Sequence, residues 1–302
     1  MPGLPRIALT AGDPAGIGPE IAEKAIEDPR VRACCEPIYY GPHRRFEPGV
    51  LSADAGQAAY ETIVRAVRDV QAGRIQGIAT APVNKEALAL AGLPWRGHTE
   101  MLASLTGAGR VAMMFWSEAL RVVLATIHIP LSAVPAALTI ESVSGIIELT
   151  HRELPRFGLE RPRLALAGLN PHAGEHGWLG SEEVDVLEPA VAHSVKSGID
   201  IVGPLPGDTV FVRAVRGEFD AVIACYHDQG LIPVKLAAFG QAVNVTLGLP
   251  IVRTSVDHGT AFDIAGKGIA DPESMVQAVL LAARLSVGEN RTAGLAAGPR
   301  HG

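Results

Sequence analysis

Cysteine is scarce in this 302-residue sequence, which contains only Cys34, Cys35 and Cys225. The adjacent pair could form a disulfide only with strain, and the spacing of the three residues matches no zinc-binding motif. We therefore expect all three to be reduced residues with a structural role.

The sequence also lacks a basic surface. Its formal net charge is -6, and no run of like charge marks a tail that would bind a partner. Because 48% of the residues are hydrophobic and only 19% are charged, a globular chain is expected rather than a disordered one. Nucleic acid is therefore not an expected partner.

Long hydrophobic runs are missing as well. No segment approaches the roughly 18 uninterrupted apolar residues that a membrane span requires. The N-terminal stretch MPGLPRIALTAGDPAG has no basic region followed by an apolar core and a cleavage site. These absences predict a cytoplasmic protein without a membrane partner.

What is present is an alternation of apolar, strand-like runs with amphipathic, helix-like segments. The runs RIALTAG, IQGIATAP, RVVLATIH, RLALAGLNPH and AVIACYHD each end in small or polar residues, and helical patterns such as AGQAAYETIVRAVRDVQAG lie between them. This alternation predicts an α/β fold with a largely parallel sheet, in two domains or one large one. YYGPHRRFEPGVLSADAG is expected to be a surface loop and ENRTAGLAAGPRHG a frayed tail.

Three of the predicted strands are followed by histidines, namely His128, His172 and His227. A single histidine in such a place is usually structural. Because the carboxyl ends of parallel strands meet at one edge of a sheet, three imidazoles there could instead bind one divalent ion and leave positions open for substrate. The pattern leaves both interpretations open.

The dinucleotide fingerprint G-x-G-x-x-G is absent. TAGDPAGIGPE has glycines in a different order and spacing, so it is either a plain strand-to-helix turn or a turn whose backbone N–H groups face an anionic substrate. A second segment, DHGTAFDIAGKGIADP at 257–272, is rich in small residues and could let a flat ligand approach the backbone closely.

Seven motifs occur in order over most of the chain: GDPAGIGPE, APVNK, GHTE, LNPHAGE, GPLPGDT, YHDQG and TSVDHGTAFDIAGKG. Together they resemble the 4-hydroxythreonine-4-phosphate dehydrogenase (PdxA) family, in the superfamily of isocitrate and isopropylmalate dehydrogenases. That resemblance implies two α/β/α domains flanking a cleft and a homodimer with its active site at the interface. Residues 1–125 with 245–302 would form an outer domain, and 126–244 a central domain with the metal ligands and dimer contacts.

The resemblance also implies roles for individual residues. It assigns the metal to His128, His172 and His227, with one ligand contributed across the dimer interface. Substrate contacts are implied for His98, Thr99, Lys235, Asn244 and Arg253. Catalytic candidates are Lys235, Asp208 and Asp257. The nicotinamide cofactor would be bound by Gly259, Thr260, Ala261, Asp263, Gly266 and Lys267. Asn244 could otherwise cap a strand, Arg253 could pair with a surface carboxylate, and Thr99 could begin a helix.

The implied reaction is oxidation of the secondary alcohol of 4-phosphohydroxy-L-threonine by NAD or NADP, with a divalent metal (Zn, Mg, Mn or Co), followed by decarboxylation in pyridoxal 5'-phosphate biosynthesis. An alternative is a paralogue that acts on D-threonate or D-erythronate 4-phosphate, or on a terephthalate-derived cis-dihydrodiol. The chain departs from the family after IYYGP, where HRRFEPGVLSADAG replaces a longer stretch. A silent binding protein and a metal-dependent hydrolase are the hypotheses from other classes.

Overall fold

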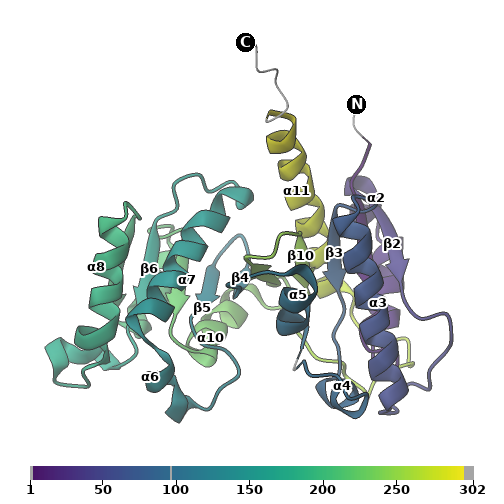
Figure 1. The fold of residues 1–302 in the computed structure, drawn as a ribbon, viewed down its shortest axis with the longest axis horizontal. Helices are drawn as coiled ribbons and strands as arrows, with labels where there is room; N and C mark the ends of the chain where they lie inside the picture. Colours follow the sequence, from purple (N-terminus) through teal and green to yellow (C-terminus); the bar gives the residue numbers. More distant parts are fainter. Residues whose placement is uncertain (1–2, 96, 296–302) are drawn as a thin grey trace. The chain divides into compact units, whose positions relative to one another are not determined.

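The computed structural model describes residues 3–95 and 97–295. The chain divides into two compact units, of which unit 1 comprises Met1–Gly109 and Leu249–Gly302 and unit 2 comprises Arg110–Gly248 (Figure 1). These units meet at 109/110 and 248/249, and the expected outer and central domains, with approximate boundaries at 125/126 and 244/245, stay a prediction.

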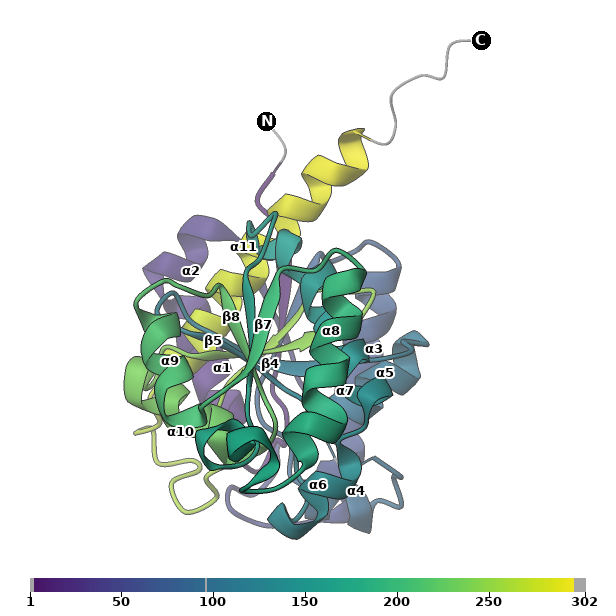
Figure 2. The same ribbon diagram turned by 90° about the vertical axis from the view of Figure 1, so that its left-hand side faces the viewer.

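Unit 1 contains four parallel strands in the order β2-β1-β3-β10. These strands are β1 (Arg6–Thr10), β2 (Glu36–Tyr40), β3 (Gly77–Thr80) and β10 (Arg253–Ser255). Its helices are α1 (Gly18–Glu27), α2 (Pro29–Cys34), α3 (Ala53–Gln71), α4 (Lys85–Leu90), α5 (His98–Thr106) and α11 (Glu273–Leu295). Figure 2 shows α1, α2 and α11 on one side of these strands and α3 and α5 on the other.

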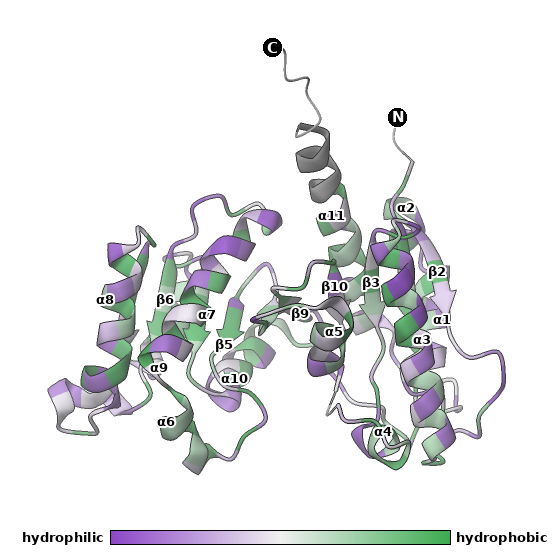
Figure 3. Cartoon of the chain, in the orientation of Figure 1, coloured by the Kyte–Doolittle hydropathy of each residue, from purple (hydrophilic) through white to green (hydrophobic). Residues whose placement is uncertain are grey.

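Helix α3 shows how the sequence produces this layer. The hydroxyl of Ser52 accepts a hydrogen bond from the backbone N–H of Ala55 and caps the helix. Small residues line the buried face, which lets neighbouring backbone come close: a methyl group at Gly56 would lie 2.1 Å from the carbonyl oxygen of Ala87 in α4. Figure 3 shows hydrophobic and hydrophilic residues alternating along this helix, as expected of a helix with one buried face.

Unit 2 contains six strands in the order β9-β4-β5-β8-β6-β7. Strand β4 is antiparallel to both β5 and β9, whereas β5, β8, β6 and β7 are parallel to one another. The strands are β4 (Ala112–Trp116), β5 (Arg121–Leu124), β6 (Leu164–Ala167), β7 (Ile201–Leu205), β8 (Ala221–Ala224) and β9 (Val243–Leu247). The main helices are α6 (Val134–Ala137), α7 (Ile140–Glu153), α8 (Glu188–Lys196), α9 (Gly207–Val215) and α10 (His227–Ala238). Four short helical segments complete the unit: η1 (Leu131–Ala133), η2 (Leu154–Phe157), η3 (Pro171–Gly177) and η4 (Glu183–Leu187).

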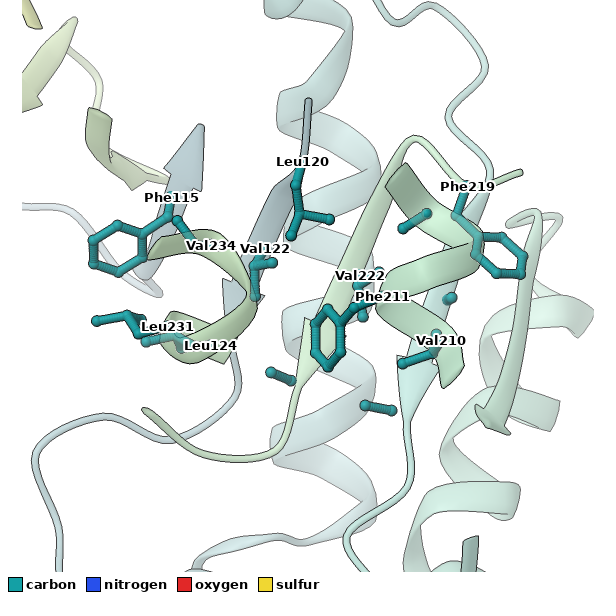
Figure 4. Close-up of a cluster of buried hydrophobic side chains, with 14 of the residues drawn as sticks. Phe115, Leu120, Val122, Leu124, Val210, Phe211, Phe219, Val222, Leu231 and Val234 are labelled. Carbon is teal, nitrogen blue, oxygen red and sulfur yellow. The ribbon is translucent and has the colours of Figure 1, made fainter. Parts of the chain in front are cut away.

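The core of unit 2 lies between this sheet and α9 and α10. Figure 4 shows Phe211 of α9 and Leu231 and Val234 of α10 packed toward Val122 and Val222 on the strands. Figure 2 shows α7 and α8 on the opposite face of the sheet. Because both faces are covered, the inner parallel strands β6 and β8 are apolar throughout, as their sequences predicted.

The five predicted strand runs correspond to β1, β3, β5, β6 and β8, so the α/β prediction is confirmed. Two local predictions are wrong. The expected surface loop starts inside β2 and ends inside α3, since Tyr40 is buried and Ser52 caps the helix. The expected frayed tail at 289–302 is helical as far as Leu295, and residues 296–302 lie outside the described part of the chain.

Among the described residues, no single helix is long and apolar enough to cross a membrane. One pair of helical segments, Leu131–Ala137 and Ile140–Phe157, passes a test of length and composition together but is bent by 88°.

Candidate active site

Two of the three predicted metal ligands lie side by side in unit 2. His128 follows β5 and His227 begins α10 directly after β8, and these two strands are parallel neighbours. The centroids of their imidazole rings are 5.5 Å apart, with the ring planes tilted by 41°. The convergence of strand ends that the sequence predicted is therefore present for this pair.

A carboxylate adjoins one of these rings. Oδ1 of Asp228 lies 2.7 Å from Nδ1 of His227, and if Nδ1 carries the proton of this hydrogen bond, Nε2 is the nitrogen left with a lone pair. A metal-binding histidine is usually oriented in this way, by a carboxylate on its other nitrogen. The pair thus has the donor chemistry that a divalent cation requires.

The third histidine lies in an unusual turn. His172 begins five consecutive residues, His172–His176, with φ between 47° and 78°, which is the left-handed helical region. Four of these residues are not glycine, and each such residue costs about 1–2 kcal/mol in this conformation. Backbone strain of this kind is common at functional sites. It persists only where the surrounding structure holds the strained residues in place.

A pocket of about 660 Å³ adjoins this turn. Its lining includes His172, Asp208 in the first turn of α9, and Tyr226 and Asp228 at the start of α10. The predicted catalytic residue Asp208 is thus brought together with His172. Lys235 is exposed further along α10 and does not line this pocket.

Asn244 lies in β9, opposite Phe115 of β4. Its side-chain oxygen Oδ1 is buried and has no hydrogen-bond partner among the described residues. A buried acceptor without a partner is costly, so this oxygen is available to a donor on a ligand. The alternative that Asn244 caps a strand does not account for it, since the residue lies within the strand.

Within one chain, the described residues contain no group of three or more His, Cys, Asp or Glu side chains that could hold a metal ion. The expected metal site of His128, His172 and His227, with one ligand contributed across a dimer interface, stays a prediction. The adjacent pair His128 and His227 fits part of an imidazole site.

Sequence reasoning gave no role to two residues that hold this region together. Gln229 accepts a hydrogen bond from the backbone N–H of Cys225 at 2.7 Å and donates one to the carbonyl of Gly168 at 2.6 Å, linking the ends of β8 and β6. Glu183 of η4 is fully buried and accepts hydrogen bonds from Asn170. The motifs YHDQG and LNPHAGE contain Gln229 and Asn170, but no motif pointed to Glu183.

Unit 1 contains the other predicted substrate residues. His98 and Thr99 are the first two residues of α5, so the helix begins one residue before the expected Thr99. Nε2 of His98 is buried without a hydrogen-bond partner among the described residues. Burial, and secondly the positive charge of Arg253, hold the pKa of His98 well below its ordinary value, so this imidazole is neutral.

Arg253, the first residue of β10, is only 3% exposed, so the alternative of a surface ion pair is wrong. Its Nε and Nη2 donate to Oγ1 of Thr80 at 3.2 and 2.8 Å. Burial lowers the pKa of Arg253 to about 9, which leaves it cationic at neutral pH. A buried cation of this kind would be stabilised by an anionic substrate group.

The small-residue loop follows β10. Asp257 lies at its start, where its Oδ1 accepts a hydrogen bond from the hydroxyl of Ser274 at 3.0 Å, next to the first residue of α11. Thr260 accepts one from the backbone N–H of Ile17 at 3.0 Å. Ala261 has a φ of 43°, and Gly259, Asp263, Gly266 and Lys267 are exposed.

Four backbone amides of the Gly-rich turn at 10–20 have partners within the chain. The backbone N–H groups of Asp13, Ala15, Gly16 and Ile17 are all hydrogen-bonded within the chain, and the turn is buried. These bonds favour the plain strand-to-helix turn, and the anion site stays a prediction. The second oxygen of Asp13, Oδ2, is buried without a partner among the described residues, and burial raises the pKa of this carboxyl group.

Comparison with known proteins agrees with this arrangement. The family model of the pyridoxal phosphate biosynthetic protein PdxA matches residues 17–282. A 4-hydroxythreonine-4-phosphate dehydrogenase of Geobacter metallireducens is 44% identical over 93% of this chain and 96% of its own length. A D-threonate 4-phosphate dehydrogenase of Cupriavidus necator is 43% identical over 94% of this chain and 98% of its own.

Solved structures of dehydrogenases from the same family are also similar to this chain. The crystal structure of 4-hydroxythreonine-4-phosphate dehydrogenase from Klebsiella pneumoniae matches with a TM-score of 0.85 and 40% identity, over 94% of this chain and 98% of that one. Isocitrate dehydrogenase from Methylococcus capsulatus, at 19% identity and a TM-score of 0.54 over 96% of this chain and 89% of that one, shares the fold. With a family model matched along most of its length and relatives 43–44% identical over nearly all of both chains, this chain belongs to the family of the pyridoxal phosphate biosynthetic protein PdxA.

Proposed function

We propose that this protein is a metal- and nicotinamide-dependent dehydrogenase that oxidises the secondary alcohol of 4-phosphohydroxy-L-threonine, in the biosynthesis of pyridoxal 5'-phosphate. The observation that carries this proposal is the imidazole pair His128 and His227, with Asp228 on the second ring, at neighbouring strand ends. Relatives named as dehydrogenases of this substrate support it.

His128, His172 and His227 are the proposed metal ligands, with one of the three contributed by the partner of a homodimer. Such an arrangement is consistent with a single chain that brings only two of the rings together. A divalent ion such as Zn, Mg, Mn or Co, when bound, would act as a Lewis acid that favours loss of the hydroxyl proton.

Residues of the loop after β10 are proposed to bind NAD or NADP, which would accept the hydride. These residues are Gly259, Thr260, Ala261, Asp263, Gly266 and Lys267. Support comes from the backbone, since the loop is exposed and lies against the start of α1 through the hydrogen bond from Ile17 to Thr260.

Several polar side chains are proposed to hold the substrate. The cationic guanidinium of Arg253 would bind an anionic group, and the neutral imidazole of His98 would supply a hydrogen bond through its unpartnered Nε2. Thr99 and Lys235 would add contacts, and Oδ1 of Asn244 would accept a hydrogen bond from a substrate N–H or hydroxyl group.

The proposed reaction moves one hydride and one proton. The C–H hydrogen of the alcohol leaves with its electron pair for the nicotinamide, and the hydroxyl proton goes to a base. The β-keto acid so formed loses carbon dioxide, and the carbon that keeps the electron pair is then protonated. Lys235 is the proposed proton carrier, with Asp208 beside His172 and Asp257 beside Ser274 as the other candidates.

A homodimer is proposed from the apolar surface of unit 2. The side chains of Leu236 and Phe239 are 84% and 82% exposed at the end of α10, and Trp178 is 89% exposed after the strained turn. Apolar residues this large are normally buried, so their exposure together favours a protein interface. Leu236→Asp with Phe239→Asp should convert the protein to a monomer in sedimentation, whereas Val195→Asp on α8 should not; an unchanged dimer in the first variant would refute this interface.

A second candidate function is the oxidation of D-threonate 4-phosphate, because a relative with that name is 43% identical along nearly the whole chain. D-Erythronate 4-phosphate and a terephthalate-derived cis-dihydrodiol are further substrates with an alcohol suited to the same chemistry. The residues proposed to bind the metal do not distinguish among these compounds.

The deciding experiment follows formation of reduced nicotinamide by absorbance, with a divalent metal and each of the four substrates in parallel. Turnover of 4-phosphohydroxy-L-threonine alone would support the proposal. Turnover of another compound alone would refute this substrate and support oxidation of that compound instead. An assay without nicotinamide tests the hydrolase hypothesis, since a hydrolase would still convert substrate. No turnover of any compound would refute the dehydrogenase assignment and favour a silent binding protein.

A further inference from the structure

Glu183 stands out because its carboxyl group is fully buried next to the strained turn. It is the first residue of the π-helical segment η4 and has 0% of its surface exposed. Its Oε1 accepts a hydrogen bond from the backbone N–H of Asn170 at 2.7 Å, and its Oε2 accepts one from Nδ2 of Asn170 at 2.9 Å. Both oxygens are therefore satisfied by one residue, which lies two positions before His172.

The carboxyl group also fills the space beneath the turn. A methyl group added at Gly174, in the middle of the turn, would lie 2.6 Å from Oε2 of Glu183. One added at Gly168, at the end of β6, would lie 3.3 Å from Oε1. Glu183 is thus packed between the strand end and the left-handed residues that follow it.

A purely packing role would not require a carboxyl group here. Burying an acid is unfavourable unless its oxygens are hydrogen-bonded, and an apolar side chain would fill the same space at less cost. What the carboxyl group adds is direction: its two acceptors bind the backbone N–H and Nδ2 of Asn170, and Oε2 of Glu182 also accepts from Nδ2 at 2.7 Å, so the position and the rotation of Asn170 are both held. Because Asn170 is held in place, the backbone position at which the left-handed turn begins is fixed as well.

We propose that Glu183 is a positioning residue that holds the left-handed turn so that His172 is presented to a divalent cation. Glu183 itself is not proposed as a metal ligand, because its fully buried carboxyl group is hydrogen-bonded to Asn170. This role rests on the metal site of the proposed function.

The test measures metal binding rather than turnover. Glu183→Gln keeps the size of the side chain but turns an amide N–H₂ toward one of the two donors of Asn170, its backbone N–H or its Nδ2, where only an acceptor can form a hydrogen bond. Its affinity for Co²⁺, measured by competition with a chromophoric chelator, should fall at least about tenfold, as is usual when a residue that orients a ligand is altered. The visible absorption of the bound Co²⁺ should change as well, because it reports the coordination geometry.

Asp185→Asn is the matched control, since Asp185 lies in the same segment but is exposed. It should bind Co²⁺ like the unaltered protein. The melting temperature of each metal-free protein separates loss of positioning from loss of fold. If the melting temperature of Glu183→Gln is lowered, Asn170→Ala is the variant to measure. It removes only the hydrogen bonds of the Asn170 side chain, and it should still lower the affinity for Co²⁺.

If Glu183→Gln, or a normally folded Asn170→Ala, binds Co²⁺ with unaltered affinity and visible absorption, the positioning role is refuted but the metal site is not. If the unaltered protein binds no Co²⁺ at all, the metal site itself is refuted and the positioning role with it. The two failures are therefore distinguishable.

Discussion

Oδ1 of Asp228 lies 2.7 Å from Nδ1 of His227, and the ring of His227 lies beside that of His128. The adjacent residue along the chain thus fixes the orientation of an imidazole at the end of a parallel strand. Because α10 begins at His227, the ring and the carboxylate both lie on the first turn of a regular helix.

Replacing this carboxylate should weaken metal binding without unfolding the protein. In Asp228→Asn the side-chain oxygen can still accept the Nδ1 hydrogen bond, but the negative charge of the hydrogen-bond partner is lost. We expect a loss of Co²⁺ affinity of roughly tenfold, measured by chelator competition. Glu160→Gln, an exposed change elsewhere in unit 2, should have no effect, and equal affinity for both variants would contradict the role given to Asp228.

Stability should depend on pH through His98. The folded state holds the pKa of His98 well below its ordinary value, so the unfolded chain takes up a proton as the pH falls through the ordinary range, whereas the folded chain does not. The free energy of unfolding should therefore decrease below about pH 6.5, by at most about 1.4 kcal/mol per pH unit from this residue, and show no such contribution above it.

Urea unfolding of the unaltered protein and of His98→Gln between about pH 5 and pH 8 measures this contribution. The variant should lose less stability on acidification, because glutamine does not titrate. Parallel curves for the two proteins over the whole range would show that the imidazole gains its proton equally well in the folded state.

Two substitutions of Arg253 separate the effect of its positive charge on substrate binding from the effect of its planar guanidinium. Arg253→Lys keeps a cation but loses the planar contact of Nε and Nη2 with Thr80, whereas Arg253→Met loses the charge as well. We expect KM for the anionic substrate to rise about tenfold or more in the methionine variant and less in the lysine variant. Steady-state kinetics decide this, and an unchanged KM in both variants would exclude contact between Arg253 and the substrate.

The strained turn predicts a stabilising substitution. Ala173 has a φ of 53°, a conformation that glycine adopts without a steric penalty. Ala173→Gly should therefore raise the free energy of unfolding by up to about 1 kcal/mol, despite the greater entropy of the unfolded glycine chain. Ala192→Gly, in the exposed part of helix α8, should lower it by about 1 kcal/mol, and a loss of similar size in both variants would show that the turn carries no strain at Ala173.

The substrate and cofactor residues were predicted only through resemblance to a family, since nothing in their spacing places His98 near Arg253. Those two residues lie 155 positions apart in the sequence and meet because α5 and β10 belong to the same unit. Likewise, the sequence of the Gly-rich turn is compatible with an anion site, and only the tertiary structure shows that four of its amides have partners within the chain.

By itself the sequence determined the α/β fold and the placement of His128 and His227 at strand ends. Both follow from local patterns, because apolar runs flanked by helical segments form buried parallel strands and the residue after such a strand lies at the edge of the sheet. Only the tertiary structure decided the left-handed turn at His172 and the burial of Glu183 beneath it. Neither has a local signal: left-handed residues other than glycine persist only where distant contacts hold them, and a glutamate in a helical segment is ordinarily solvated until the fold encloses it.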